Sequence, residues 1–124
     1  MAKTILIVDD EPDVVTYLTA LLRDAGYETL EAFDGEQAME QIRKTRPDLI
    51  TLDITMPEMT GVRTYRTLKE DPDLKGIPVV IITGVSPDFR QFISTRSKVP
   101  PPEGYLEKPI TPEDLLAEVR KHLA

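Results

Sequence analysis

The chain has 124 residues, a length typical of one domain, and its 40% apolar and 30% charged residues exclude a disordered or fibrous protein. Its 22 acidic residues against 15 basic ones give a net charge of −7, which repels a phosphate backbone, so no direct nucleic-acid binding is expected. The absence of cysteine excludes disulfides and thiolate metal sites. From the length we expect one globular domain over residues 1–124.

The first apolar run, from Thr4 to Val8, is short and rich in branched residues, which predicts a buried strand. Acidic residues from Asp9 to Glu11 end this run, so it is too short for the core of a signal peptide. No later stretch approaches the length that spans a membrane. We therefore expect a soluble, cytoplasmic protein without a membrane partner.

A helix and an edge strand are predicted next. Pro12 suits the first helical position, with Glu11 as a candidate cap, and Gly26 suits the position after the helix. The segment from Tyr27 to Ala32 alternates in polarity and is less apolar than the first strand, which indicates an edge strand.

The second helix and the remaining strands follow. Asp34 and Gly35 open a helix, and apolar runs predict buried strands from Asp48 to Leu52 and from Ile77 to Ile82. Tyr105 and Leu106 are expected to form a short fifth strand. This alternation of strand and helix predicts an α/β fold, with a parallel sheet and helices on both faces.

Two further helix starts come from proline. Pro87 and Pro112 suit first helical positions, after the capping residues Ser86 and Thr111. His122 on the last helix is expected to be solvated.

Polar side chains stand where the predicted strands end. Asp9 and Asp10 follow the first strand, Asp53 the third, Thr83 the fourth, and the fifth leads to Lys108. Because parallel strands end at the same edge of a sheet, these residues converge on the edge where α/β proteins bind ligands. They form one candidate site.

The residue types at this site suggest phosphoryl transfer. Three neighbouring carboxylates repel one another and need a cation, and an open, all-oxygen site suits Mg²⁺. Asp53 can act as the nucleophile, as carboxylates do in aspartyl-phosphate chemistry. Mg²⁺, the Lys108 ammonium and the Thr83 hydroxyl would stabilise the phosphoryl oxygens.

Four segments carry family motifs, in this order: Val8-Asp9-Asp10-Glu11, Asp53 to Gly61, Ile81-Ile82-Thr83-Gly84 and Tyr105-Leu106-Glu107-Lys108-Pro109. Together they resemble the response regulator receiver domain of the CheY-like family, and the resemblance covers essentially the whole chain. It implies a doubly wound, five-stranded parallel sheet of flavodoxin-like type with strand order 2-1-3-4-5.

The resemblance also implies roles for the site residues. Asp53 would accept a phosphoryl group from a sensor histidine kinase or a small acyl phosphate. Mg²⁺ would be held by Asp9, Asp10, Asp53 and the backbone carbonyl of Thr55, with Asp10 a more direct ligand than Asp9. Such a protein is a phospho-switch in a two-component system and not a turnover enzyme.

The switch itself is implied by the same resemblance. Thr83 would turn toward the phosphoryl group and Tyr105 would swing inward, which changes a surface that contacts a downstream protein. The bond between Lys108 and Pro109 would be a cis peptide.

Each site residue also has a simpler interpretation. The acids from Asp9 to Glu11 could cap a helix, Asp53 could precede a turn, Thr83 could end a strand, and Lys108 could lie on the surface. Tyr105 could be a packing residue, and Met56 and Met59 are expected to pack beneath their loop.

The segment before Tyr105 departs from the family pattern. Three prolines, Pro100 to Pro102, end the fourth helix by about Lys98. One hypothesis is that residues 86–102 form a docking surface for a partner, with Arg90 and Arg96 among its charges. A rigid spacer is the alternative.

Two other classes of protein remain open at this point. A phosphatase or phosphotransferase with an aspartyl intermediate would place a second acid two residues after the nucleophile, where this chain has Thr55. A flavin-binding module shares the fold type. The sequence also leaves open whether the chain is a stand-alone protein or part of a larger one.

Overall fold

The computed structural model describes residues 2–55, 60–84 and 103–123, apart from the side chains of Thr60 and Thr83. The strands are β1 (Thr4–Val8), β2 (Glu28–Ala32), β3 (Leu49–Asp53), β4 (Val79–Thr83) and β5 (Gly104–Glu107). The helices are α1 (Pro12–Asp24), α2 (Gly35–Lys44), α3 (Thr60–Glu70) and α5 (Pro112–Leu123). The expected helix start at Pro87, the proposed docking segment and both loop methionines lie outside the described residues.

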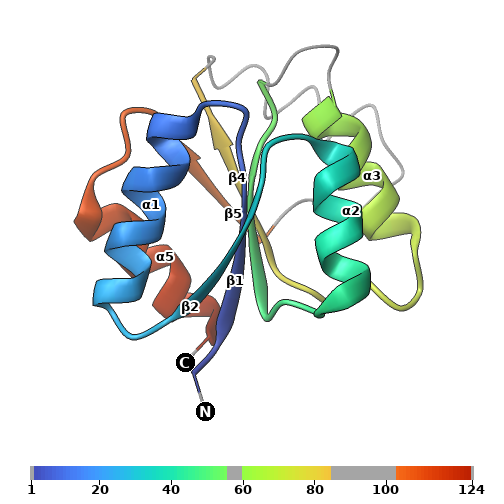
Figure 1. The fold of residues 1–124 in the computed structure, drawn as a ribbon, viewed down its shortest axis with the longest axis horizontal. Coiled ribbons are helices and arrows are strands. Elements are labelled where there is room, and N and C mark those ends of the chain that lie inside the picture. The colour runs from blue at the N-terminus through green and yellow to red at the C-terminus, as the bar shows by residue number, and fades with distance from the viewer. Residues whose placement is uncertain (1, 56–59, 85–102, 124) are drawn as a thin grey trace.

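The five strands form one parallel sheet in the order β2-β1-β3-β4-β5, which confirms the predicted fold class and the edge position of β2. Figure 1 views this sheet nearly edge-on, with α1 and α5 on one face and α2 and α3 on the other. A parallel sheet with both faces covered needs strands that are apolar on both sides, as β1 and β4 are.

Alternate residues of each strand face opposite helix layers. In β1, Ile5 and Ile7 pack with α1 and α5, whereas Leu6 and Val8 pack with α2 and α3. The same alternation in β3 turns Leu49 toward α1 and α5, so Asp53, four residues on, points to that side at the end of the strand.

The predicted helix boundaries have local causes in the structure. α1 begins at Pro12, and α2 begins after Asp34, whose side chain accepts a hydrogen bond from the Gln37 amide. Gly26 follows α1 with a φ of 96°, a conformation that glycine adopts without strain. The expected starts of α1 at Pro12 and of α2 after Asp34 are therefore confirmed.

An ion pair between a buried lysine and a partly exposed glutamate lies at the edge of the sheet where β4 begins. Lys69 Nζ, at the end of α3, contacts Glu103 Oε1 at 2.9 Å, and the Lys69 side chain is only 2% exposed. The same carboxylate oxygen accepts a hydrogen bond from the Val79 amide at 2.7 Å. Glu103 therefore ties the start of β5 to both β4 and α3.

Some details differ from the sequence predictions. β3 begins at Leu49, one residue later than expected, and the Asp48 side chain before it accepts a hydrogen bond from the Thr4 amide. β4 begins at Val79, two residues later than expected, after Pro78. His122 is not solvated: its side chain is 14% exposed and contacts Glu118 at 3.3 Å, because this face of α5 packs beside β5.

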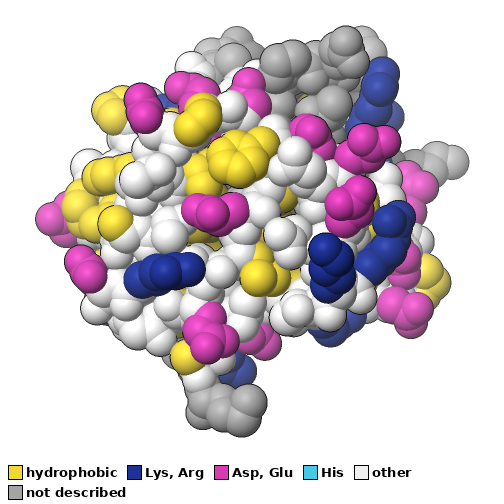
Figure 2. Space-filling view, in the orientation of Figure 1, with side chains coloured by type: hydrophobic (Ala, Val, Ile, Leu, Met, Phe, Trp, Pro, Cys, Tyr) yellow, Lys and Arg dark blue, Asp and Glu magenta, His cyan; other side chains and the backbone are white. Residues whose placement is uncertain are grey.

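The charge of the chain is not gathered in one place on the face shown in Figure 2. Acidic side chains are spread over the whole face, whereas most of the basic side chains in view lie on the side of α2 and α3. None of the helices in the described residues is long and apolar enough to cross a membrane.

Candidate functional site

The candidate site lies at the carboxyl edge of the sheet, where β1, β3 and β5 end. Val8 pairs with Leu52, so Asp9 and Asp53 come next at the same level of neighbouring strands. Lys108 follows directly on β5 and approaches both carboxylates. The parallel register therefore brings together side chains that are far apart in the sequence, as predicted.

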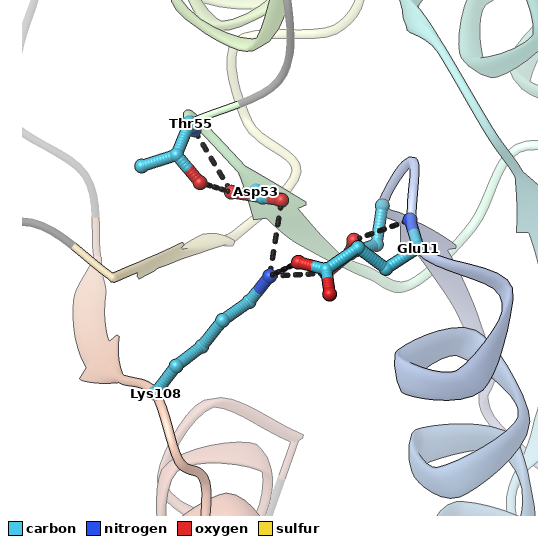
Figure 3. Close-up of polar contacts among 5 residues, drawn as sticks. Glu11, Asp53, Thr55 and Lys108 are labelled. Carbon is cyan, nitrogen blue, oxygen red and sulfur yellow. Dashed lines mark hydrogen bonds and ion pairs between the residues drawn. The ribbon is translucent and has the colours of Figure 1, made fainter.

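Asp53 is buried, and both of its carboxylate oxygens have partners. Oδ1 accepts hydrogen bonds from the Thr55 amide at 2.8 Å and from the Thr55 hydroxyl at 2.6 Å. Oδ2 accepts one from Lys108 Nζ at 3.2 Å, and Figure 3 shows the lysine reaching across from β5 to this oxygen. These contacts hold the carboxylate in one orientation at the edge of the sheet.

Asp9 is also buried, whereas Asp10 beside it is exposed. Asp9 Oδ1 accepts a hydrogen bond from the Glu11 amide at 2.9 Å. Oδ2 has no hydrogen-bond donor among the described residues, although Lys108 Nζ lies 3.2 Å away as an ion pair. Burial, with a contribution from the charge of Asp53, raises the pKa of Asp9 from 3.8 to about 6.

Lys108 has three anionic neighbours. Besides Asp9 and Asp53, its ammonium donates a hydrogen bond to Glu11 Oε1 at 2.9 Å. Burial alone would lower the pKa of Lys108, but the hydrogen bond to Glu11 and the charges of Asp53 and Asp9 outweigh it and raise the pKa above its usual range. The ammonium therefore stays charged and compensates the buried carboxylates.

The contact with Glu11 was missed by the sequence prediction, which treated this residue as a helix cap. Glu11 does occupy the cap position of α1, but its side chain makes no cap hydrogen bond and turns to Lys108 instead. No local pattern signals this contact, because the two residues are 97 positions apart.

Gly61 explains how α3 can start so close to Asp53. A Cβ atom at this position would overlap the backbone oxygen of Asp53 and would lie 2.6 Å from Cα of Ile54. Only glycine allows the backbone of the helix to approach β3 this closely. Gly61 therefore fixes the position of α3 relative to the strand that carries the candidate nucleophile.

The cluster has the composition of a site for a hard cation. Ligand oxygens of Asp9, Asp10, Glu11 and Asp53 all lie within 4.8 Å of one another. Asp9 belongs to this cluster, and its buried Oδ2 lacks a hydrogen-bond donor among the described residues. An all-oxygen donor set with exposed and buried carboxylates fits a divalent cation that keeps part of its water shell.

Thr83 and Tyr105 are described to different extents. Thr83 is the last residue of β4 and pairs with Glu107 of β5, but its side chain lies outside the described part of the structure. Tyr105 is half-buried and packs against the core cluster on the side of α2 and α3. The bond between Lys108 and Pro109 is cis, as the resemblance implies.

Comparison with known proteins agrees with this geometry. The family model for the response regulator receiver domain matches residues 5–120. The DNA-binding response regulator MtrA of Mycolicibacterium smegmatis is 36% identical over 123 residues, which cover 99% of this chain and 51% of MtrA. Protein Rrf1 of Nitratidesulfovibrio vulgaris is 36% identical over 124 residues, which cover 100% of this chain and 85% of Rrf1.

A solved structure gives the same result for the fold. The chemotaxis protein CheY4 of Vibrio cholerae superposes with a TM-score of 0.85 at 31% identity, over 98% of this chain and 99% of CheY4.

The exclusion of nucleic-acid partners on the basis of net charge was wrong. MtrA is named a DNA-binding response regulator, and the match with MtrA covers 99% of this chain. The chain spans about half the length of MtrA. The net charge of the matched part therefore cannot exclude DNA as a partner of a protein that contains such a domain.

Proposed function

The chain belongs to the response regulator receiver domain family of two-component systems, and we propose that it is a phospho-switch that accepts a phosphoryl group on Asp53. The domain would span residues 1–124 and receive the group from a histidine kinase or a small acyl phosphate. The cytoplasmic location stays a prediction from the sequence.

The observation that carries the proposal is the environment of Asp53. Its carboxylate is buried at the edge of the sheet, and its two oxygens are oriented by Thr55 and Lys108. A fixed carboxylate beside a permanent positive charge is what in-line attack on a phosphoryl group needs, since most of the catalysis in phosphoryl transfer comes from positioning and charge.

A magnesium ion fits the donor set of the site. Asp10, Asp53, Asp9 and the backbone carbonyl of Thr55 would hold it, with Asp10 the more direct ligand of the two N-terminal acids. When bound, Mg²⁺ would neutralise charge on the phosphoryl oxygens and on the carboxylates around them.

The chemical step uses the residues of the chain in a simple way. A carboxylate oxygen of Asp53 attacks phosphorus, and a bond forms between them as the bond to the donor breaks. The electron pair of the broken bond leaves with the carboxylate of an acyl phosphate or stays on the imidazole nitrogen of a phosphohistidine. Lys108 and the Thr83 hydroxyl would donate hydrogen bonds to the transferred phosphoryl oxygens.

Phosphorylation would then change the surface of the domain. Thr83 would turn toward the phosphoryl group, and Tyr105 would move further into the space beside it. The half-buried position of Tyr105 against the core on the side of α2 and α3 supports this role, because a small movement can bury the rest of the ring. The protein would act through this change and not through turnover.

A titration with beryllofluoride, which mimics a bound phosphoryl group, tests the proposal in the presence of Mg²⁺. We expect the wild-type protein to bind it and Asp53→Asn to lose that binding. A protein that does not bind beryllofluoride, or that hydrolyses a phosphomonoester over many turnovers, would contradict the switch and favour a phosphatase.

A further inference from the structure

The shortest contact of Lys108 is with a residue that has no part in the proposed chemistry. Its Nζ atom lies 2.9 Å from Glu11 Oε1, compared with 3.2 Å from the nearest oxygens of Asp53 and Asp9. Figure 3 shows the lysine side chain extending from the end of β5 to a point between Glu11 and Asp53. Glu11 therefore shares the cation on which phosphoryl transfer depends.

A lysine ammonium has three hydrogen atoms to donate, and in this structure three carboxylates surround it. Two of these hydrogen atoms are donated, to Glu11 and Asp53, and the Asp9 carboxylate lies 3.2 Å away as an ion pair. A phosphoryl oxygen on Asp53 would therefore compete with these anions for the ammonium. The side chains of Asp9 and Asp53 are each 1% exposed, whereas that of Glu11 is 60% exposed. Released Glu11 regains water, and a released buried carboxylate does not.

We propose that Glu11 is a positioning residue, which holds the Lys108 ammonium at the carboxyl edge of the sheet in the resting protein and releases it to the phosphoryl group. This inference rests on the proposed function of Asp53. It assigns to the cap position of α1 a role in setting how readily the switch is turned on.

The backbone around Glu11 suits a side chain that can leave its partner. The Glu11 amide is fixed by its hydrogen bond to Asp9 Oδ1 at 2.9 Å, so the residue stays in place. Its carboxylate makes no cap hydrogen bond with α1, so the helix loses no cap when the side chain turns away. The exchange therefore requires rotation of one side chain.

The direction of the effect follows from the charge. In the resting protein, Glu11 competes with the incoming dianion for Lys108 and also repels it. Removal of this competitor should strengthen binding of a phosphoryl mimic by about two- to fivefold, since exposed ion pairs contribute only modestly to stability. Glu11→Ala should give the larger gain and Glu11→Gln a smaller one, because the amide oxygen can still accept a hydrogen bond from Lys108.

Beryllofluoride titrations at saturating Mg²⁺, followed by ¹⁹F nuclear magnetic resonance, test the proposal. Asp13→Asn is the matched control, because Asp13 is an exposed acid in the first turn of α1 that makes no hydrogen bond or ion pair among the described residues. We expect the affinity of Asp13→Asn for beryllofluoride to equal that of the wild type. If Asp13→Asn binds as tightly as Glu11→Ala, or if Glu11→Ala binds no more tightly than the wild type, the inference is wrong.

The ¹⁵N resonance of the Lys108 ammonium supplies a second readout that a purely structural role would not change. Glu11→Ala should shift this resonance in the resting protein and leave it unchanged in the beryllofluoride complex, where the lysine has already left Glu11. Equal shifts in both states would overturn the proposal. Failure of the wild type to bind beryllofluoride would instead contradict the proposed function itself.

Discussion

Lys108 Nζ lies 3.2 Å from Asp53 Oδ2, although the two residues are 55 positions apart in the chain. The contact exists because β3 and β5 are parallel members of one sheet and end at the same edge. It joins the candidate nucleophile to an ammonium that lies 3.2 Å from both buried carboxylates, Asp9 and Asp53.

Gly61→Ala should destabilise the protein. The added methyl group would overlap the Asp53 backbone, so α3 or the end of β3 must move, at a cost of about 1–3 kcal/mol. Urea-induced unfolding measures the change in free energy. Gly76→Ala is the control, because a Cβ there meets no atom within 4 Å, and its effect should stay within about 0.5 kcal/mol. Equal effects of the two substitutions would mean that the close approach is not required.

Thr51→Val should stabilise the protein by about 1–2 kcal/mol. Thr51 is fully buried in β3, and its hydroxyl has no hydrogen-bond partner among the described residues. Valine has nearly the same shape and removes the polar atom. Thr51→Ser keeps the hydroxyl and loses the methyl group, so thermal unfolding should show a change in the opposite direction. A loss of stability in Thr51→Val would reveal a partner for the hydroxyl.

Asp9→Asn should stabilise the metal-free protein at pH 7.5 by about 1–3 kcal/mol. Because burial raises the pKa of Asp9 to about 6 in the folded protein, the stability linked to its protonated form is fully present below pH 3.8 and is lost as the pH rises through 6. Asparagine mimics the protonated form, so its advantage should shrink as the pH falls from 7.5 toward 4.

Denaturant unfolding at several pH values in a chelating buffer measures this difference. Asp13→Asn removes the same charge from an exposed position and should change the free energy of unfolding by less than about 0.5 kcal/mol at each pH. An advantage of Asp9→Asn that does not vary with pH would show that its cause is not the ionisation of Asp9.

Glu103→Ala should cost about 2–4 kcal/mol of stability. It removes the carboxylate that pairs with the buried Lys69 ammonium and accepts a hydrogen bond from the Val79 amide. The ammonium keeps its hydrogen bonds to the Lys75 and Ile77 carbonyls but loses its anionic partner. In urea unfolding, the loss in free energy of unfolding should be well above that caused by Glu113→Ala. Glu113 is an exposed acid in the first turn of α5. Similar losses for both substitutions would mean that the pair of Lys69 with Glu103 contributes nothing.

Much of the fold could be predicted from the sequence, because buried parallel strands are apolar runs, which in this chain end abruptly at polar residues. β1 was predicted with its observed bounds, and Asp53 was placed at the correct edge. α3 could not be delimited in this way, since buried Thr64 and Lys69 interrupt its apolar face. The burial of those polar residues depends on tertiary contacts, such as the pair of Lys69 with Glu103.

The site, too, contains some contacts that the sequence could predict and others that it could not. The edge at which Asp9, Asp53 and Lys108 meet follows from strand direction alone, so sequence reasoning could find it. The contact of Glu11 with Lys108 depends on the direction of one side chain at a helix cap, which no spacing indicates. The two hydrogen bonds from Thr55 to Asp53 also depend on local loop geometry, and the prediction concerned only the Thr55 carbonyl.

The most direct test of the central claim is the intact mass of the protein after incubation with acetyl phosphate and Mg²⁺. We predict that the wild type gains the mass of one phosphoryl group, that a chelator prevents the gain, and that Asp53→Asn shows none. A gain that persists in Asp53→Asn, or no gain in a folded wild type, would contradict the assignment of Asp53 as the phosphoacceptor.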